Sequence, residues 1–67
     1  MAVAKVTEII SSSSKSFDDA VSNGIRRAHK TIKNIRGAWI AQQKITVDKG
    51  KITEFRVVMR VTFVLDD

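Results

Sequence analysis

The sequence of 67 residues contains no cysteine and a single histidine, His29. Disulfides are therefore excluded, and one histidine does not supply the Cys and His ligands of a structural zinc site. A chain of this length hides only about 60% of its unfolded surface when it folds. Such small domains are usually stabilised by disulfides, by a metal or by association of subunits. We therefore expect one domain, residues 1–67, that is stabilised by oligomerisation.

Long apolar segments are also absent. The longest apolar stretches, such as Val61–Leu65, suit a strand and fall short of the roughly 18 residues that a membrane span needs. Near the N-terminus, Lys5 and Glu8 interrupt any apolar core of a signal peptide. The sequence thus predicts a cytoplasmic protein with no membrane partner.

Acidic residues are few: seven Asp and Glu stand against twelve Lys and Arg, for a net charge of +5 at pH 7. The carboxylates are scattered, and neither a Ser-His-acid arrangement nor a metal-ligand spacing is present. We therefore expect no enzyme and no metal site within one chain. The excess of positive charge leaves an anionic partner open, whether nucleic acid, phosphate or an anionic cofactor.

Periodicity predicts a strand followed by a helix. Residues 2–10 alternate as a strand of mixed polarity, which the serine run Ser11–Ser14 is predicted to end. Ser16 is the predicted helix N-cap, because its hydroxyl can accept the backbone N–H of Asp19. Apolar residues at three- and four-residue steps extend the helix to about Asn34. They are Phe17, Ala20, Val21, Gly24, Ile25, Ala28, Ile32 and Ile35.

Alternation returns after Asn34 and predicts two further strands, over residues 35–47 and 54–65. Between them, Asp48–Gly50 is a turn signal in which Gly50 can adopt a positive φ. The order is β-α-β-β. We therefore predict an α+β fold in which a three-stranded antiparallel sheet wraps over one amphipathic helix.

The sheet face that turns away from the helix is predicted to be of mixed polarity. A hairpin that turns at residues 49–50 places Gln43 near Arg56 and Trp39 near Arg60. This face then collects Trp39, Gln43, Arg56, Val58 and Arg60. Exposure of such a surface to water is unfavourable in free energy, so we expect neighbouring copies of the chain to cover it.

The chain contains, in order, five strings that resemble the dodecin family: Lys5–Ile10, Ser14–Phe17, Ile25–Ala28, Thr31–Ile35 and Phe55–Phe63. The resemblance covers essentially the whole chain. It implies a hollow homododecamer with sheets inside and helices outside. Dodecins hold flavins (riboflavin, FMN or FAD) in stacked pairs between subunits, store them and quench their photochemistry, and some members bind coenzyme A.

The resemblance places unusual residues at the flavin positions. In flavin-binding members a tryptophan opens the second strand and stacks on the isoalloxazine ring, and a glutamine on the third strand bonds the ring edge. Counting without gaps puts Gly37 at the tryptophan and Arg56 at the glutamine, while Trp39 falls two residues late, where the family usually has an acid. Lys44 corresponds to a basic residue that contacts flavin phosphate in some bacterial members. The candidate cofactor-binding residues are therefore Gly37, Trp39, Gln43, Lys44, Arg56 and Arg60.

Two interpretations of Trp39 stay open. Strand side chains repeat every two residues, so Trp39 shares the face of Gly37 at a distance of about 6.6 Å. It either stacks on a ligand in a displaced pocket or fills a subunit interface.

Arg56 and Arg60 also have two interpretations. A guanidinium only donates, whereas a glutamine donates and accepts at a flavin edge. Copies of Arg56 that meet across a two-fold axis repel one another unless an anion, such as the phosphate of FMN or coenzyme A, lies between them. Alternatively, both arginines form salt bridges with Glu8 or Glu54 of a neighbour.

Three functional hypotheses follow. The first is a shell that binds and sequesters flavin, or a related anionic cofactor, at subunit interfaces. The second is a similar shell without flavin, which acts as a scaffold or binds another small molecule or ion. The third is a small nucleic-acid-binding module, which the net charge supports. Stacking platforms for nucleic acid carry several exposed aromatics, whereas Phe55 and Phe63 are predicted to face the helix, so nucleic acid is not the favoured partner.

Overall fold

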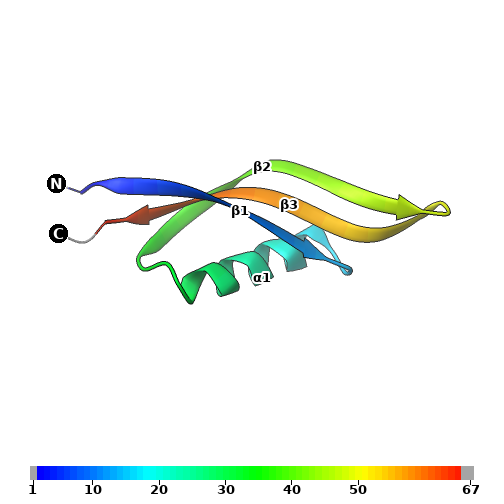
Figure 1. Cartoon of the computed structure of the whole chain (residues 1–67), viewed down its shortest axis with the longest axis horizontal. Helices are drawn as coiled ribbons and strands as arrows, with labels where there is room; N and C mark the ends of the chain where they lie inside the picture. The colour runs from blue at the N-terminus through cyan, green and yellow to red at the C-terminus, as the bar shows by residue number, and fades with distance from the viewer. Residues whose placement is uncertain (1, 66–67) are drawn as a thin grey trace.

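The computed structural model describes residues 2–65 and contains one helix and three strands in that range. The elements are β1 (Ala4–Ser13), α1 (Phe17–His29), β2 (Ile35–Asp48) and β3 (Lys51–Val64). The strands form one antiparallel sheet in the order β1-β3-β2, so β3 lies in the centre. Figure 1 shows α1 along one face of this sheet, where it packs mainly on β1 and β3. The predicted α+β fold is confirmed.

β1 is longer than predicted because it includes most of the serine run. Ser11–Ser13 pair with Phe55–Val57 of β3, so the prediction that the serines end the strand was wrong. The physical reason is that β3 offers backbone partners over this whole length, and ladder hydrogen bonds do not depend on the polarity of the side chain. The run joins strand to helix only at its end, where Ser13 Oγ donates to Asp19 Oδ2 at 2.6 Å.

α1 begins as predicted and ends earlier. The hydroxyl of Ser16 accepts the backbone N–H of Asp19 at 3.0 Å, which confirms the N-cap. The helix ends at His29, whereas the apolar period predicted an end near Asn34. Asn34 has φ 62, a left-handed conformation that a right-handed helix cannot contain, and the chain turns there into β2. Within residues 2–65, no helix has the length and apolar character that would let it cross a membrane.

The core lies between α1 and the central strand. Ala20 of α1 and Val57, Met59 and Val61 of β3 have no exposed surface. At the start of the helix the rings of Phe17 and Phe55 meet edge to face, with centroids 5.2 Å apart and planes at 78°. The prediction that the row beginning at Phe55 faces the helix is therefore confirmed.

The β2–β3 hairpin turns where the sequence predicted. Lys49 and Gly50 have φ values of 52 and 77, the pair of left-handed residues that a two-residue type I′ turn requires. In Figure 1 this end of the hairpin extends beyond α1 as an arm, and the described chain measures 52 × 19 × 13 Å. All of β2 after Ile35 is exposed in a single chain.

Candidate ligand-binding face of the sheet

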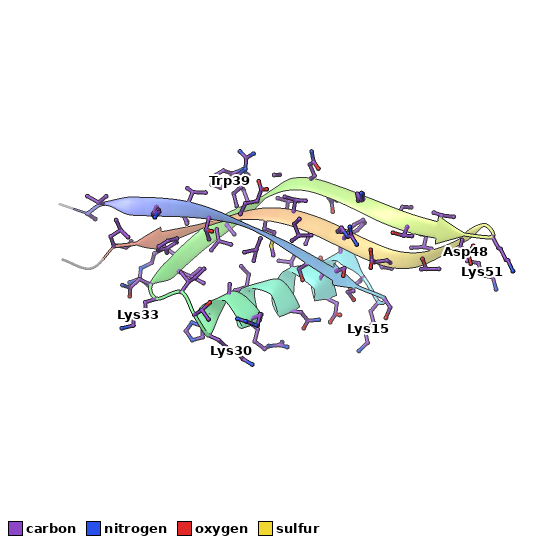
Figure 2. The ribbon with its side chains drawn as sticks, viewed as in Figure 1. Lys15, Lys30, Lys33, Trp39, Asp48 and Lys51 are labelled. Atoms are coloured by element: carbon purple, nitrogen blue, oxygen red, sulfur yellow. The ribbon has the colours of Figure 1, made fainter. Side chains whose placement is uncertain are left out.

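The face of the sheet that points away from α1, called the open face below, carries side chains from all three strands. Residues that pair directly across antiparallel strands share a face. Three neighbouring rows cross the open face: Glu8, Arg60 and Trp39; Ile10, Val58 and Gln42; Ser12, Arg56 and Lys44. Figure 2 shows Trp39 on this side, opposite α1 and Lys30, the residue that follows the helix.

Trp39 lies opposite Arg60, as predicted. Its side chain is 46% exposed in the single chain, so an aromatic surface is available for contact with a ligand or another subunit. The guanidinium of Arg60 turns the other way, and its Nε donates to Glu8 Oε2 at 3.3 Å. The salt bridge predicted with a neighbour is thus formed inside one chain. Since both side chains are about half exposed, it contributes at most about 1 kcal/mol to stability.

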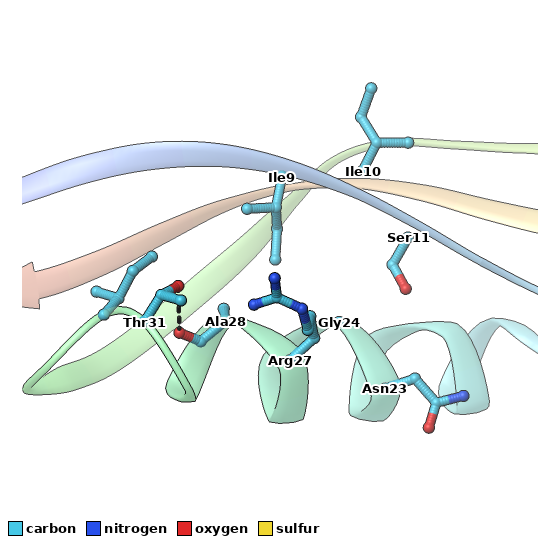
Figure 3. A pocket seen from close by; sticks show the side chains of 9 residues that line it. Ile9, Ile10, Ser11, Asn23, Gly24, Arg27, Ala28 and Thr31 are labelled. Carbon is cyan, nitrogen blue, oxygen red and sulfur yellow. Dashed lines mark hydrogen bonds between the residues drawn. The ribbon is translucent and has the colours of Figure 1, made fainter.

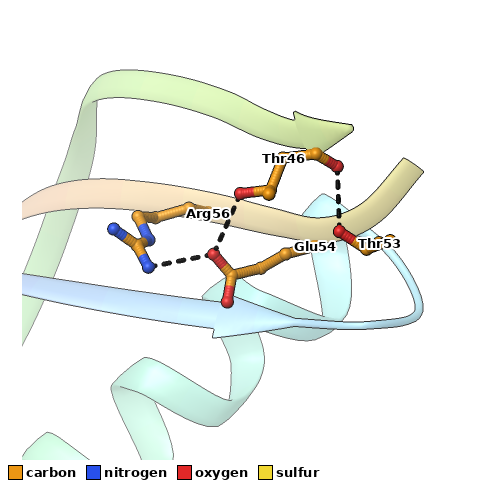
Figure 4. A network of polar contacts seen from close by, with 4 residues as sticks. All are labelled: Thr46, Thr53, Glu54 and Arg56. Atoms are coloured by element: carbon orange, nitrogen blue, oxygen red, sulfur yellow. Dashed lines mark hydrogen bonds and ion pairs between the residues drawn. The ribbon is translucent and has the colours of Figure 1, made fainter. Parts of the chain in front are cut away.

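Arg56 belongs to a second polar group on the open face, drawn in Figure 4. Its Nη2 lies 2.9 Å from Glu54 Oε1, and Thr46 Oγ1 donates to the same oxygen at 3.4 Å. Thr53 Oγ1 donates in turn to the backbone oxygen of Thr46 at 3.2 Å. The Nε of Arg56 is buried and has no hydrogen-bond partner among the described residues. Because this nitrogen is buried, only the outer part of the side chain, which is 41% exposed overall, is accessible to a ligand or a neighbouring subunit.

A β-bulge in β2 changes the predicted position of Gln43. The register shifts between Ile40 and Gln42, so Ala41 is an extra residue without a partner in β3. As a result Gln43 pairs with Val57, and the prediction that it lies near Arg56 was wrong. A shift of one residue moves a side chain to the other face of a sheet. Gln43 consequently shares the α1 side with buried Val57.

The same bulge brings two other side chains to the open face. Gln42, which the sequence did not single out, lies opposite Val58, and Lys44 lies opposite Arg56. The sequence does not show which of the two adjacent glutamines lies on the open face, because no residue pattern marks the bulge at Ala41. Among residues 2–65, Lys44 has no ion-pair partner, so its charge is available to an anion.

Gly37 leaves room beside Trp39. It pairs with Thr62, whose Oγ1 donates to the backbone oxygen of Gly37 at 3.0 Å. That hydroxyl, at 3.4 Å, is the one atom near a Cβ built at Gly37, so the space above the glycine is open. A planar ligand lying on Trp39 can extend over this position.

The open face offers donors and an aromatic surface rather than a set of acids. In the part of the chain that the structure describes, no group of three or more His, Cys, Asp or Glu residues is placed to hold a metal ion. Its two carboxylates, Glu8 and Glu54, are each bonded to an arginine. The arrangement suits a ligand that combines a planar ring with an anionic group.

The chain resembles known proteins both in sequence and in structure. Residues 3–66 match the model of the Dodecin family. Calcium dodecin of Mycobacterium tuberculosis is 38% identical over 64 residues, which cover 94% of this chain and 89% of that protein. The solved structure of dodecin from Streptomyces davaonensis has a TM-score of 0.94 at 32% identity, covering 98% of this chain and 97% of that one. The structure of the M. tuberculosis protein, described with a novel calcium-binding site, has a TM-score of 0.81 at 34% identity, with 96% and 91% covered.

Proposed function

Because this chain belongs to the dodecin family, we propose that it forms a homododecameric shell whose open sheet faces bind and sequester a flavin or a related anionic cofactor. The flavin is riboflavin, FMN or FAD, and coenzyme A is a related candidate. The observation that carries this proposal is the exposed row that Trp39 and Arg60 form beside Lys44 and Arg56. The role is one of binding and storage rather than catalysis, and we place the shell in the cytoplasm.

Assembly is supported by the apolar surface of the single chain. Within residues 2–65, five buried apolar residues make up the core, which is small for a free-standing domain. By contrast, Ile45, Val47 and Ile52 on the hairpin arm are 43%, 53% and 49% exposed. Each Å² of apolar surface removed from water contributes about 25 cal/mol. Covering the arm and the open face with neighbouring copies therefore adds the stabilisation that the core of one chain lacks.

The residues of the open face fit a phosphorylated flavin better than a neutral one. Trp39 can stack on the isoalloxazine ring, and the free space at Gly37 accommodates the rest of the ring system. The Arg56 side chain is 41% exposed, and its guanidinium can donate to the phosphate but cannot accept from the ring N–H. The ammonium of Lys44 can pair with a phosphate. Bound flavin would contribute its redox-active and light-absorbing ring, and the protein would hold that ring away from water.

The test is a titration of riboflavin and FMN that follows the quenching of flavin fluorescence. Intact assembly is checked in parallel by size-exclusion chromatography with an absorption spectrum. We expect saturable quenching for both flavins, with the tighter binding for FMN. No quenching at micromolar protein in an intact dodecamer would refute flavin binding and leave assembly unaffected, whereas a monomer in dilute buffer would refute the shell itself.

A second candidate is a shell of the same architecture that binds an ion or another small molecule instead of flavin. The name of the M. tuberculosis relative, calcium dodecin, supports it. So does the ion pair between Glu54 and Arg56, which occupies part of the arginine that replaces the family's glutamine. Isothermal titration with Ca²⁺ and with FMN on the same preparation separates the two candidates, because each predicts heat from one ligand alone.

A further inference from the structure

A second hollow lies on the opposite side of the sheet, between α1 and the edge strand β1. It has a volume of about 450 Å³, within the size range of small-molecule pockets. Figure 3 shows Ile9 above it and Ala28 below it, with Arg27 directed from α1 toward Ile9. None of the open-face residues at which we place the cofactor lines this hollow, called the helix groove below, so an inference about it is independent of flavin binding.

The helix groove has an apolar floor and one charged group. Ile9, Ala28 and Ile32 supply the apolar surface, whereas Arg27 is the one ionisable residue among those that line it. The Arg27 side chain is exposed and has neither an ion pair nor a hydrogen bond among the described residues. No carboxylate lines the groove, so the positive charge is not neutralised within the chain.

The charge around the groove is positive over a long stretch of sequence. Residues 20–33, which include most of α1 and the segment after it, contain four Lys and Arg and no Asp or Glu. Part of this excess complements the negative end of the helix dipole, as the basic last turn of α1 does. That effect explains cations near the helix end in general. It does not account for the side chain of Arg27, whose guanidinium has no ion-pair partner within residues 2–65 and points toward Ile9 at the hollow.

A neighbouring hollow extends the groove around the end of α1. It has a volume of about 320 Å³ and shares Thr31 and Ile32 with the first. Phe63 and Leu65 line its far side, and Lys33 is its one charged residue. The two hollows thus form an elongated, mainly apolar path with cations along it, which matches the shape of a linear chain better than that of a compact ring.

We propose that the helix groove binds an anionic amphiphile, namely an aliphatic carboxylate whose headgroup pairs with Arg27. Its chain lies on Ile9 and Ile32 and continues toward Leu65. A guanidinium pairs with a carboxylate through two parallel hydrogen bonds, and the apolar floor removes the chain from water. Charge complementarity favours this occupant over a neutral lipid, because a neutral ligand leaves the guanidinium without a partner.

The isoleucines of the chain provide both the probe and its control. In protein labelled at the Ile δ1 methyl groups, Ile9 and Ile32 report on the groove, whereas Ile45 and Ile52 report on the exposed arm. Methyl NMR is suited to the assembled protein. Titration with decanoate is expected to shift the first set saturably and to leave the second set unchanged. Decan-1-ol, which has the same chain without the charge, is expected to bind about tenfold more weakly.

Two matched variants test the headgroup contact. Arg27→Gln is expected to weaken decanoate binding about tenfold. Lys30→Gln, which removes an exposed charge at the C-cap of the helix and outside the groove, is expected to change it less than twofold. Equal binding of the alcohol, or full decanoate binding by R27Q, would overturn the proposal. So would shifts at Ile45 and Ile52, or an absence of shifts at saturating decanoate, which would mean that another copy already fills the groove in the assembly.

Discussion

Gly24 of α1 lies against Met59 of β3 so closely that a Cβ at position 24 would stand 2.6 Å from Met59 Cε. Ser11 Cβ, on β1, would be 2.9 Å away. Both distances are shorter than normal carbon contacts, and Met59 has no exposed surface into which it can move. The glycine thus sets how near the helix lies to the sheet, which explains a residue that ordinarily weakens a helix interior.

Gly24→Ala is therefore expected to destabilise the protein by about 1 kcal/mol. The gain in helix propensity, about 1 kcal/mol, is outweighed by overpacking, which costs about 1–3 kcal/mol. Urea unfolding followed by circular dichroism measures the change. Ser22→Ala on the exposed side of the same helix is the control and is expected to be neutral or slightly stabilising. A G24A protein more stable than wild type would contradict the close packing.

Ser16→Ala is expected to cost about 1 kcal/mol, because the N–H of Asp19 loses the hydroxyl that accepts it at 3.0 Å. The matched control is Ser14→Ala, whose exposed side chain makes no hydrogen bond within the described residues. The same unfolding measurement distinguishes the two. Equal midpoints for both variants would show that the cap does not stabilise α1.

The sequence predicted those parts of the fold in which local patterns and packing agree. Alternation over residues 54–65 identified the central strand, and the hydroxyl of Ser16 identified the start of the helix. The end of the helix was missed because Ile32 and Ile35 continue its apolar period, although Asn34 ends the right-handed backbone. The serine run was assigned to a loop because its membership of β1 depends on how far the central strand extends, which is not a local property.

The candidate site was only partly predictable for a similar reason. Trp39 was placed opposite Arg60 correctly, because the register shift near Thr46 and the one at Ala41 cancel between the turn and this pair. Between the two register shifts, over residues 42–46, each predicted partner is displaced by one residue, so Lys44 and not Gln43 lies opposite Arg56. The ion pair of Arg60 with Glu8 joins residues 52 positions apart. It depends on β1 lying beside β3, and charge patterns within one segment do not reveal that neighbour.

The single tryptophan provides a direct test of assembly. Trp39 is 46% exposed in the isolated chain, so burial of the open face by neighbouring copies must remove its indole from water. We expect its emission to shift to shorter wavelength, and its quenching by acrylamide to fall, when dilute protein is concentrated and assembles. Because there is no other tryptophan, the signal needs no deconvolution. An emission spectrum that is identical in monomer and assembly would place Trp39 outside every interface.

The hairpin arm is expected to contribute to assembly rather than to the fold of one chain. Ile52→Glu introduces a charge on a residue that is 49% exposed, beyond the helix-covered core, and is expected to shift the species from oligomer to monomer by size-exclusion chromatography. Its far-UV circular dichroism should stay close to that of the wild type. Ser22→Glu adds the same charge on the exposed side of α1 and serves as the control. A dodecamer of undiminished stability in I52E would exclude the arm from the subunit contacts.

Glu54 restrains Arg56, which the sequence resemblance places at the family's glutamine position, and removal of the Glu54 charge is expected to strengthen anion binding. In Glu54→Gln the Nη2 of Arg56 loses the carboxylate charge that holds it at 2.9 Å, so the guanidinium becomes more available to a phosphate. FMN should then bind about tenfold more tightly, while riboflavin, which has no phosphate, should bind as before. Stability should change by less than about 1 kcal/mol, since this ion pair is partly exposed. Glu8→Gln is the matched control, because it frees Arg60 in the row of Trp39 and leaves Arg56 paired. If E54Q raised the affinity for riboflavin as much as for FMN, Arg56 would be acting on the ring and not on the phosphate.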